Sequence, residues 1–169
     1  ILSEKRLEGA STITQQVAKN FLLTSEVSIK RKIKEAILAF RIERAYSKER
    51  IMELYLNQIY LGEGTYGVAA ASLEYFDKAI SELNYEEAAL LAALPRAPST
   101  YNPYKSVEKA KVRRNTVLKN LYHNSYINKT EYEELIKKDI KTKKRKIKLL
   151  EEANYYTEEV RRIVSDMYG

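Results

Sequence analysis

Apolar residues recur every three or four positions along most of this chain, which is the spacing of one face of an α-helix. Between residues 11 and 22, for example, four-residue steps separate Ile13, Val17 and Phe21. The chain has only 5 Gly and 3 Pro, too few for the many tight turns of a β-sandwich or barrel. No stretch shows convincing strand alternation, so the sequence predicts a mainly α-helical domain.

Each expected helix is an apolar stripe bounded by capping residues, glycines or prolines. The expected helices cover residues 11–22, 28–44, 47–61, 69–76, 85–94, 107–123 and 130–140, with a final amphipathic segment at 154–168. The segment 28–44 is apolar on two sides, which predicts an interior helix. The glycines of 62–67 predict a break, and the prolines of 95–103 an extended loop. Thr130 and Glu133 form the expected capping box of the 130–140 helix.

The composition excludes several kinds of functional site, and the sequence pattern indicates how the chain is organised. With no Cys and one His, disulfides, thiolate zinc sites and cysteine nucleophiles are excluded. The net charge of +7 favours an anionic partner, which could be nucleic acid, a membrane surface or a phosphorylated substrate. The core domain is expected at residues 1–140, followed at 141–169 by a basic segment and the amphipathic segment. Because Ile1 is not an initiator Met, we expect an internal part of a longer protein.

One polar helix face combines the hydroxyl of Thr12, the amide of Gln16 and the ammonium group of Lys19. Such a face can hold an oxygen-rich anion, although a solvated surface is the simpler interpretation. A second cationic cluster follows closely in the sequence. The proximity of the two clusters favours an anion site.

The second cluster contains Arg31, Lys32 and Glu35. A surface ion pair between Arg31 and Glu35, worth a few tenths of a kcal/mol, is its simplest interpretation. However, Leu38 and Ile42 share the same side of the helix, which predicts a partly buried carboxylate. A partly buried Glu beside two cations is the better candidate for function. Arg can hold a phosphate with two donors, and Lys supplies a compact charge.

Four motifs follow one another in a fixed order: Gly9–Asn20 with Ser-Thr-x-Thr-Gln-Gln, Arg31–Glu35 with Arg-Lys-x-x-Glu, residues 48–76 and residues 94–103. Together they resemble the signature of glycosyltransferase family 51, over roughly residues 9–139. The resemblance implies a mainly helical, lysozyme-like domain that partly enters the membrane. It places that domain at the outer face of the bacterial cytoplasmic membrane.

The resemblance also implies a reaction, in which lipid II units are joined into glycan strands with inversion. The 4-hydroxyl of an acceptor sugar displaces undecaprenyl diphosphate from an anomeric carbon. Glu35 is the implied catalytic residue, which assists departure of the diphosphate. Asn57 is expected to have a mostly structural role. The implied substrate-binding residues, which neutralise or hydrogen-bond the diphosphate or shape the site, are Ser11, Thr12, Gln16, Lys19, Asn20, Arg31, Lys32 and Asn57.

The partners that the resemblance implies are lipid II, the growing lipid-linked glycan, the membrane surface and cell-wall synthesis proteins, without nucleic acid. No cofactor and no metal ligand is assigned, and a divalent cation is left open. Residues 154–160 resemble the connector into a transpeptidase domain. The parent is therefore expected to be a class A penicillin-binding protein, with an ordinary closing helix as the alternative.

One motif of the family has no counterpart in these 169 residues. It is a Glu-Asp pair followed by Phe and His-x-Gly, and its Glu is the expected general base that deprotonates the acceptor hydroxyl. We therefore expect the chain to be N-terminally incomplete and, as given, inactive in polymerisation.

Other patterns suggest other functions. Residues 62–67 match the Gly-x-Gly-x-x-Gly dinucleotide fingerprint, but no strand is expected before them. Residues 106–109 have the Ser-x-x-Lys spacing of a transpeptidase nucleophile without its partner motifs. The Lys-rich stretch 137–148 leaves a basic membrane-surface or nucleic-acid binding module as an alternative, although interleaved aromatics are missing. A lysozyme-type hydrolase is a further alternative that shares the fold class.

Overall fold

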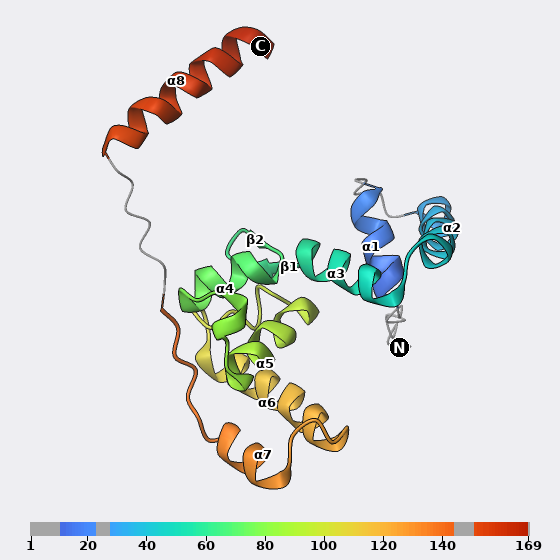
Figure 1. Ribbon diagram of the computed structural model, residues 1–169, viewed down its shortest axis with the longest axis vertical. Helices are drawn as coiled ribbons and strands as arrows, with labels where there is room; N and C mark the ends of the chain where they lie inside the picture. Colours follow the sequence, from blue (N-terminus) through green and yellow to red (C-terminus); the bar gives the residue numbers. More distant parts are fainter. Residues whose placement is uncertain (1–10, 23–27, 144–150, 169) are drawn as a thin grey trace, which may run out of the picture.

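The computed structural model describes residues 11–22, 28–143 and 151–168, and helices dominate these ranges (Figure 1). The expectation of a mainly helical domain is confirmed. The α-helices are α1 (Ile13–Phe21), α2 (Ile29–Ala45), α3 (Lys48–Gln58), α4 (Val68–Phe76), α5 (Tyr85–Ala93), α6 (Val107–His123), α7 (Lys129–Leu135) and α8 (Glu151–Tyr168). Two short 3₁₀ helices are η1 (Ile80–Glu82) and η2 (Leu94–Arg96), the second spanning the boundary between the expected helix 85–94 and the expected proline loop.

The bounds of α7 differ from the prediction. Its N-cap is Asn128, whose side chain accepts a hydrogen bond from the Glu131 backbone amide, so the Thr130/Glu133 capping box is wrong. Asn is a stronger N-cap than Thr, which moves the helix start toward the N-terminus. The helix ends at Leu135 instead of residue 140. The carbonyls of Leu135 and Ile136 lie 3.5 and 3.4 Å from Nη2 of Arg114.

A two-stranded antiparallel hairpin occupies the stretch that was predicted only as a glycine-rich break. Strand β1 (Tyr60–Gly62) pairs with β2 (Thr65–Tyr66), and α3 therefore ends at Gln58 rather than at residue 61. The strands are too short to show an alternating pattern in the sequence. The expectation of no strand is wrong at this point.

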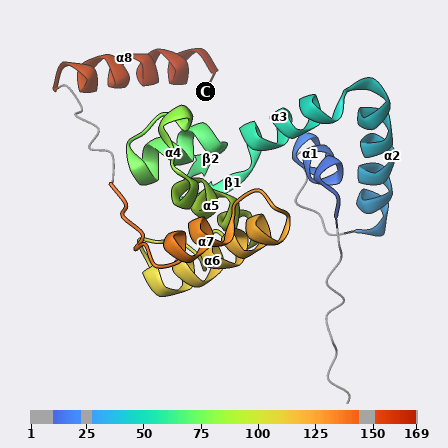
Figure 2. The ribbon, with the colours of Figure 1, turned by 60° about the horizontal axis from the view of Figure 1, so that its bottom comes forward.

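Three apolar clusters divide the described helices into two lobes (Figures 1 and 2). The first lobe consists of α1, α2 and α3, and its core contains Val17, Ala18, Ala39, Ile42 and Ile51. The second lobe consists of the hairpin and α4 to α7. Its two clusters contain, among others, Leu61, Tyr75, Leu90 and Leu94, and Ala89, Leu118, Ile127 and Leu135. The C-terminal end of α3 leads directly into the hairpin and thereby connects the lobes.

Helix α2 covers the first lobe with one face only. Its buried residues are Glu35, Ala39 and Ile42. On the other face, the exposed fractions of Ile29, Ile33, Ile37 and Phe40 are 83, 56, 52 and 61%. The prediction of an interior helix is therefore wrong, because no other described helix covers this second apolar stripe.

Residues 137–143 form an extended strap along the second lobe. The backbone amide of Lys143 donates to the Tyr75 carbonyl at 2.8 Å, and the Lys143 ammonium group lies 2.8 Å from the Asp77 carboxylate. Part of the predicted basic run, residues 144–148, lies outside the described residues. Beyond it, α8 lies apart from both lobes in two views (Figures 1 and 2). None of the described helices has the length and apolarity that a membrane span requires.

Gly67 lets the end of the hairpin approach α3 closely. A Cβ at this position would lie 2.6 Å from the Asn57 carbonyl oxygen, and its φ is +82°. We expect Gly67→Ala to lower the free energy of unfolding by about 3 kcal/mol, from left-handed strain and overpacking together. Gly64→Ala is the matched control, since Gly64 has φ +71° and no atom within 4 Å of its Cβ position. Urea unfolding of both variants measures the difference, and equal losses would contradict the clash.

Candidate active site

Helix α1 begins with a capping box that uses one of the candidate residues. The Gln15 backbone amide donates to the Thr12 hydroxyl at 3.1 Å, and the Thr12 amide donates to Gln15 Oε1 at 3.2 Å. This reciprocal pair satisfies two amides that a helix start leaves open. The hydroxyl of Thr12 therefore has a structural role in addition to any contact with a ligand.

Glu35 on α2 is the most deeply buried carboxylate of the described residues, with 1% of its surface exposed. Its side chain lies 3.0 Å from Lys32 Nζ and 3.4 Å from Arg31 Nε. Ser28 caps α2 by accepting a hydrogen bond from the Arg31 amide at 3.1 Å, which fixes the turn that carries both cations. Burial of a carboxylate is costly unless cations or donors compensate it, and two cations do so here.

Lys32 connects this carboxylate to α1. Its ammonium group donates to the Ser11 hydroxyl at 3.0 Å as well as to Glu35. The Lys32 side chain is 54% exposed, in contrast to 17% for Arg31. An anion that approaches from solvent would therefore meet the Lys32 ammonium group directly, with Glu35 behind it. We refer to Ser11, Arg31, Lys32 and Glu35 as the Glu35 cluster.

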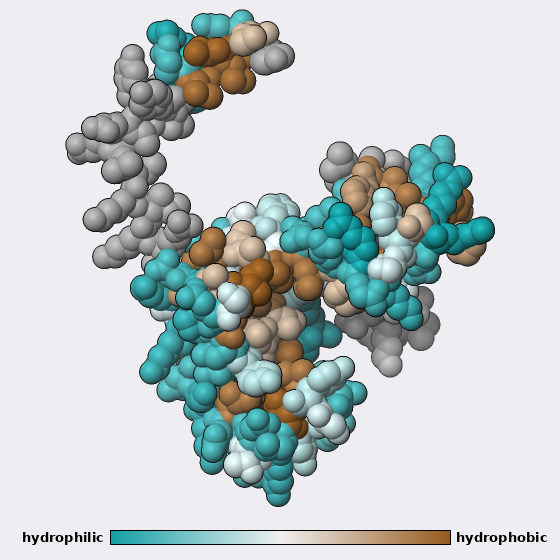
Figure 3. Space-filling view, viewed as in Figure 1, coloured by the Kyte–Doolittle hydropathy of each residue, from teal (hydrophilic) through white to brown (hydrophobic). Residues whose placement is uncertain are grey.

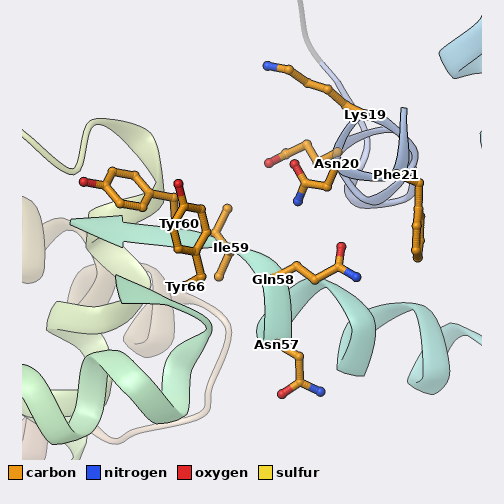
Figure 4. Close-up of a pocket in the computed structure, with 9 residues that line it drawn as sticks. Lys19, Asn20, Phe21, Asn57, Gln58, Ile59, Tyr60 and Tyr66 are labelled. Carbon is orange, nitrogen blue, oxygen red and sulfur yellow. The ribbon is translucent and has the colours of Figure 1, made fainter. Parts of the chain in front are cut away.

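A cleft of about 500 Å³ separates α1 from the hairpin. Figure 4 shows Lys19 and Asn20 extending from α1 toward the hairpin, and Asn57 pointing away from α1. The residues that line the cleft are Gln16, Lys19, Asn20, Phe21, Asn57, Gln58, Ile59, Tyr60 and Tyr66. Both lobes thus contribute polar and aromatic side chains to one opening.

The predicted site residues fall into two groups. Gln16, Lys19, Asn20 and Asn57 line the cleft, whereas Ser11, Thr12, Arg31, Lys32 and Glu35 lie near the starts of α1 and α2. Along the axis of α1, Lys19 lies roughly 10 Å from the N-cap Thr12, whereas Gln16 lies one turn, roughly 6 Å, from it. An extended ligand could reach both groups.

Tyr60 and Tyr66 are cleft residues that sequence analysis did not single out. Their ring centroids are 5.0 Å apart at an interplanar angle of 46°, and both side chains remain exposed. Exposed aromatic faces suit the apolar face of a sugar ring, and their hydroxyls suit its polar edge. Two tyrosines flanking a glycine-rich turn were the signal in the sequence that could have found them.

The second lobe holds the tyrosine hairpin in place. The Tyr75 hydroxyl donates to the Leu61 carbonyl at 3.0 Å, and Asn102 Nδ2 donates to Glu63 Oε1 at 2.5 Å. Burial raises the pKa of the Tyr75 hydroxyl well above its usual range, so this hydroxyl stays a donor at physiological pH. Asn102 Oδ1 in turn accepts a hydrogen bond from the Tyr104 backbone amide at 2.8 Å. The position of the tyrosine pair is therefore set by the packing of the second lobe.

The described residues contain no cluster of three or more His, Cys, Asp or Glu side chains that could hold a metal ion. Three side chains supply positive charge at the site. Lys19 lies in the last turn of α1, and Arg31 and Lys32 lie in the first turn of α2. This arrangement suits an anionic ligand with several oxygen atoms.

Comparison with known proteins gives matches over nearly the whole chain. A family model described as Transglycosylase matches residues 1–122. Penicillin-binding protein 1A of Aquifex aeolicus is 52% identical over 164 residues, covering 96% of this chain and 22% of that protein. Penicillin-binding protein 1A of Rickettsia felis is 49% identical over 166 residues, covering 98% of this chain and 21% of that protein.

A solved structure is similar as well. The crystal structure of penicillin-binding protein 1A from Haemophilus influenzae has a TM-score of 0.57 and 36% sequence identity. The match covers 93% of this chain and 20% of that chain. The present chain thus corresponds to about a fifth of the length of the relatives it matches.

Proposed function

The chain belongs to the transglycosylase family, and on that premise we propose that it polymerises lipid II into peptidoglycan glycan strands. Membership confirms the resemblance to glycosyltransferase family 51 of class A penicillin-binding proteins, and the helical fold agrees with it. The observation that carries the proposal is the Glu35 cluster, in which a buried carboxylate lies between two cations, one of which donates to Ser11 just before α1, a helix that lines the cleft.

The proposed reaction is an inverting displacement at an anomeric carbon. The 4-hydroxyl oxygen of the acceptor sugar forms a bond to that carbon, while the bond from the carbon to the diphosphate oxygen breaks. The proton of the acceptor hydroxyl passes to a general base, and the electron pair of the broken bond leaves with the diphosphate. Two functions are therefore required, a base at the acceptor and stabilisation of the leaving diphosphate.

Stabilisation of the leaving group is the function that the Glu35 cluster and α1 support. Arg31 and Lys32 supply positive charge beside Glu35, and the Lys32 ammonium group is accessible to a ligand. Lys19 adds a third cation at the cleft end of α1. Cations placed in advance where negative charge develops lower the barrier without a cost of reorganisation. We assign Glu35 to assistance of diphosphate departure, through its hold on these two cations.

The lining of the cleft combines apolar and polar side chains, which suits a sugar. Gln16 and Asn20 on α1 offer amides, and Tyr60 and Tyr66 offer rings on the opposite side. The side chain of Asn57 points away from α1, while its carbonyl oxygen meets the backbone at Gly67. This placement supports a mostly structural role for Asn57 and a direct one for the α1 amides.

The exposed stripe of α2 supports a location at the membrane surface, where a lipid-linked substrate would be found. Its large apolar residues are flanked along the helix by Lys30, Lys34, Arg41 and Arg44, which are all exposed. An amphipathic helix with cations on its polar face is typical of a segment that lies in the headgroup region. We propose that this helix contacts the outer face of the cytoplasmic membrane.

The parent protein is proposed to have two domains. Residues 1–140 would form the glycosyltransferase core, and residues 141–169 the basic segment and the connector toward a transpeptidase domain. The isolated position of α8, with Val160, Ile163, Val164 and Met167 exposed, is consistent with a helix that packs against further chain (Figure 3). The coding sequence downstream of Gly169 tests this directly, since a stop codon there would indicate a single-domain enzyme.

A lipid II assay tests the proposed function. A longer protein that includes this chain is incubated with lipid II in detergent, and the products are separated by length. We expect longer chains that remain lipid-linked, together with released undecaprenyl diphosphate. Released reducing sugar ends without elongation would indicate a lysozyme-type hydrolase and refute the proposal.

The diphosphate site makes a separate prediction. Lys19→Ala and Arg31→Ala should each weaken binding of a diphosphate-bearing lipid by about 2 kcal/mol, the usual scale for loss of a charged hydrogen-bond partner. Lys119→Ala is the control, because Lys119 is an exposed lysine on α6 in the other lobe. Calorimetric titration of the lipid measures the affinities. Unchanged affinity in both variants would place the anion elsewhere.

A further inference from the structure

A second cavity lies in the second lobe, between the strap of residues 137–143 and the helices α4 to α6. Its volume is about 730 Å³, and it shares no lining residue with the cleft. The edge of this lobe along which the strap runs is largely hydrophilic (Figure 3). The strap is part of the Lys-rich stretch for which the glycosyl transfer reaction provides no role.

Arg114 on α6 lines this cavity and is only 1% exposed. Its Nε and Nη2 donate to Asn115 Oδ1 at 3.1 and 2.8 Å, and Nη2 also approaches the two carbonyls at the end of α7. All of these acceptors are uncharged. The remaining nitrogen, Nη1, is buried and has no hydrogen-bond partner. Burial also lowers the pKa of this guanidinium, which is the sign of an under-compensated buried charge.

The carboxylates around the cavity are already engaged by other cations. Glu86 pairs with Lys138 at 3.0 Å, Glu87 with Lys78 at 2.7 Å and Asp139 with Lys111 at 2.6 Å. Within the part of the chain that the structure describes, no carboxylate lies within ion-pair distance of Arg114. The same is true of Lys137 and Lys141, which also line the cavity. Three cations therefore line one cavity without an ion-pair partner of their own, although the carboxylates of Glu86 and Asp139 lie near enough to Arg114 to compensate its charge in part.

We propose that this cavity binds a phosphate-bearing anion. The exposed Lys137 and Lys141 on the strap would make the first contacts, and Arg114 would supply fixed positive charge and an uncommitted donor at the base. Guanidinium and ammonium groups together suit phosphate, whose several oxygens and multiple charge match three cations better than one carboxylate does. The site is independent of the cleft, and its ligand is either a soluble phosphate compound or a phospholipid headgroup.

The test uses the whole chain carrying Lys19→Ala and Arg31→Ala, so that the cleft does not contribute to anion binding. Inorganic pyrophosphate is titrated at constant ionic strength, with chloride as the balancing ion, while calorimetry follows the melting temperature. A ligand that binds the folded state raises this temperature in a saturable way. We expect such a rise, and at least a tenfold weaker apparent affinity after Lys137→Ala and Lys141→Ala are added. Lys119→Ala with Lys129→Ala, two exposed lysines elsewhere, should leave the affinity unchanged.

Two further measurements separate the sources and the outcomes. Vesicles of phosphatidylglycerol, compared with phosphatidylcholine, test a headgroup ligand, and a lower affinity for them in the Lys137/Lys141 variant, with the binding expected of α2 remaining, would identify that source. Arg114→Gln should weaken pyrophosphate binding at least tenfold as well. If that variant does not fold, the affinity of the Lys137/Lys141 variant tests the proposal. Equal responses of all variants, or no saturable response to either pyrophosphate or anionic vesicles, would overturn the proposal.

Discussion

Glu35→Gln is expected to lower the rate of lipid II polymerisation by at least about a hundredfold, the lower end of the usual effect of losing one group that stabilises developing negative charge. The substitution keeps the shape of the side chain and removes the charge that holds Arg31 and Lys32 in place. Both cations would then be free to turn away from the leaving diphosphate. The measurement is the rate of glycan chain formation by a longer protein that includes this chain.

The matched control for this substitution is Glu53→Gln. Glu53 on α3 also pairs with a cation three residues away, Arg50 at 2.6 Å, but its side chain is 55% exposed. The activity of the control should be unchanged, and both variants should retain their helicity and melt close to the parent temperature. Near-normal polymerisation by Glu35→Gln would show that Glu35 only pairs with its neighbours and is not catalytic.

Local signals predicted most helices correctly, because apolar spacing and caps are encoded within a few residues. Ser47 caps α3 as expected, and α6 occupies Val107–His123, the range its pattern predicts. The predicted capping residue of α7 was wrong because two residues, Asn128 and Thr130, each have a side-chain oxygen that can cap a helix start. A choice between two adequate caps depends on where the rest of the helix packs.

The sequence could not show which apolar surfaces are covered. The stripe from Ile29 to Phe40 has the spacing of a buried face, but no other described helix packs on it. Periodicity reports that a face is apolar, whereas its partner depends on the tertiary arrangement. The same limit explains Arg114, whose guanidinium group reaches the Ile136 carbonyl, 22 residues away in the sequence.

The sequence motifs predicted the residues of the candidate site, but not their division into a cleft group and the Glu35 cluster. Motif residues on α1 appear continuous in the sequence, while the structure places Lys19 at the cleft and Ser11 in the Glu35 cluster. The short helix between them creates this separation. Tyr60 and Tyr66 reach the cleft only because the hairpin brings them together. Hydrogen bonds from the second lobe set the position of that hairpin.

The 169-residue chain alone is expected to polymerise lipid II at close to the background rate. An inverting displacement needs one group to take the acceptor proton and another to stabilise the leaving group, by analogy with two-carboxylate glycosidases. Glu35, held between two cations, can serve only the second of these functions. None of the described residues that line the cleft is a carboxylate.

Because no described residue that lines the cleft is a carboxylate, the expected loss is that of a general base, which contributes typically about 10²–10⁴-fold. The experiment compares the 169-residue chain with a version extended upstream to include a Glu-Asp motif of the family, at equal concentration in detergent with lipid II. The extended version with that Glu changed to Gln is the control, and it should be as slow as the short chain. Comparable turnover by the short and the extended versions would mean that the base lies within these 169 residues, and the proposed division of roles would then be wrong.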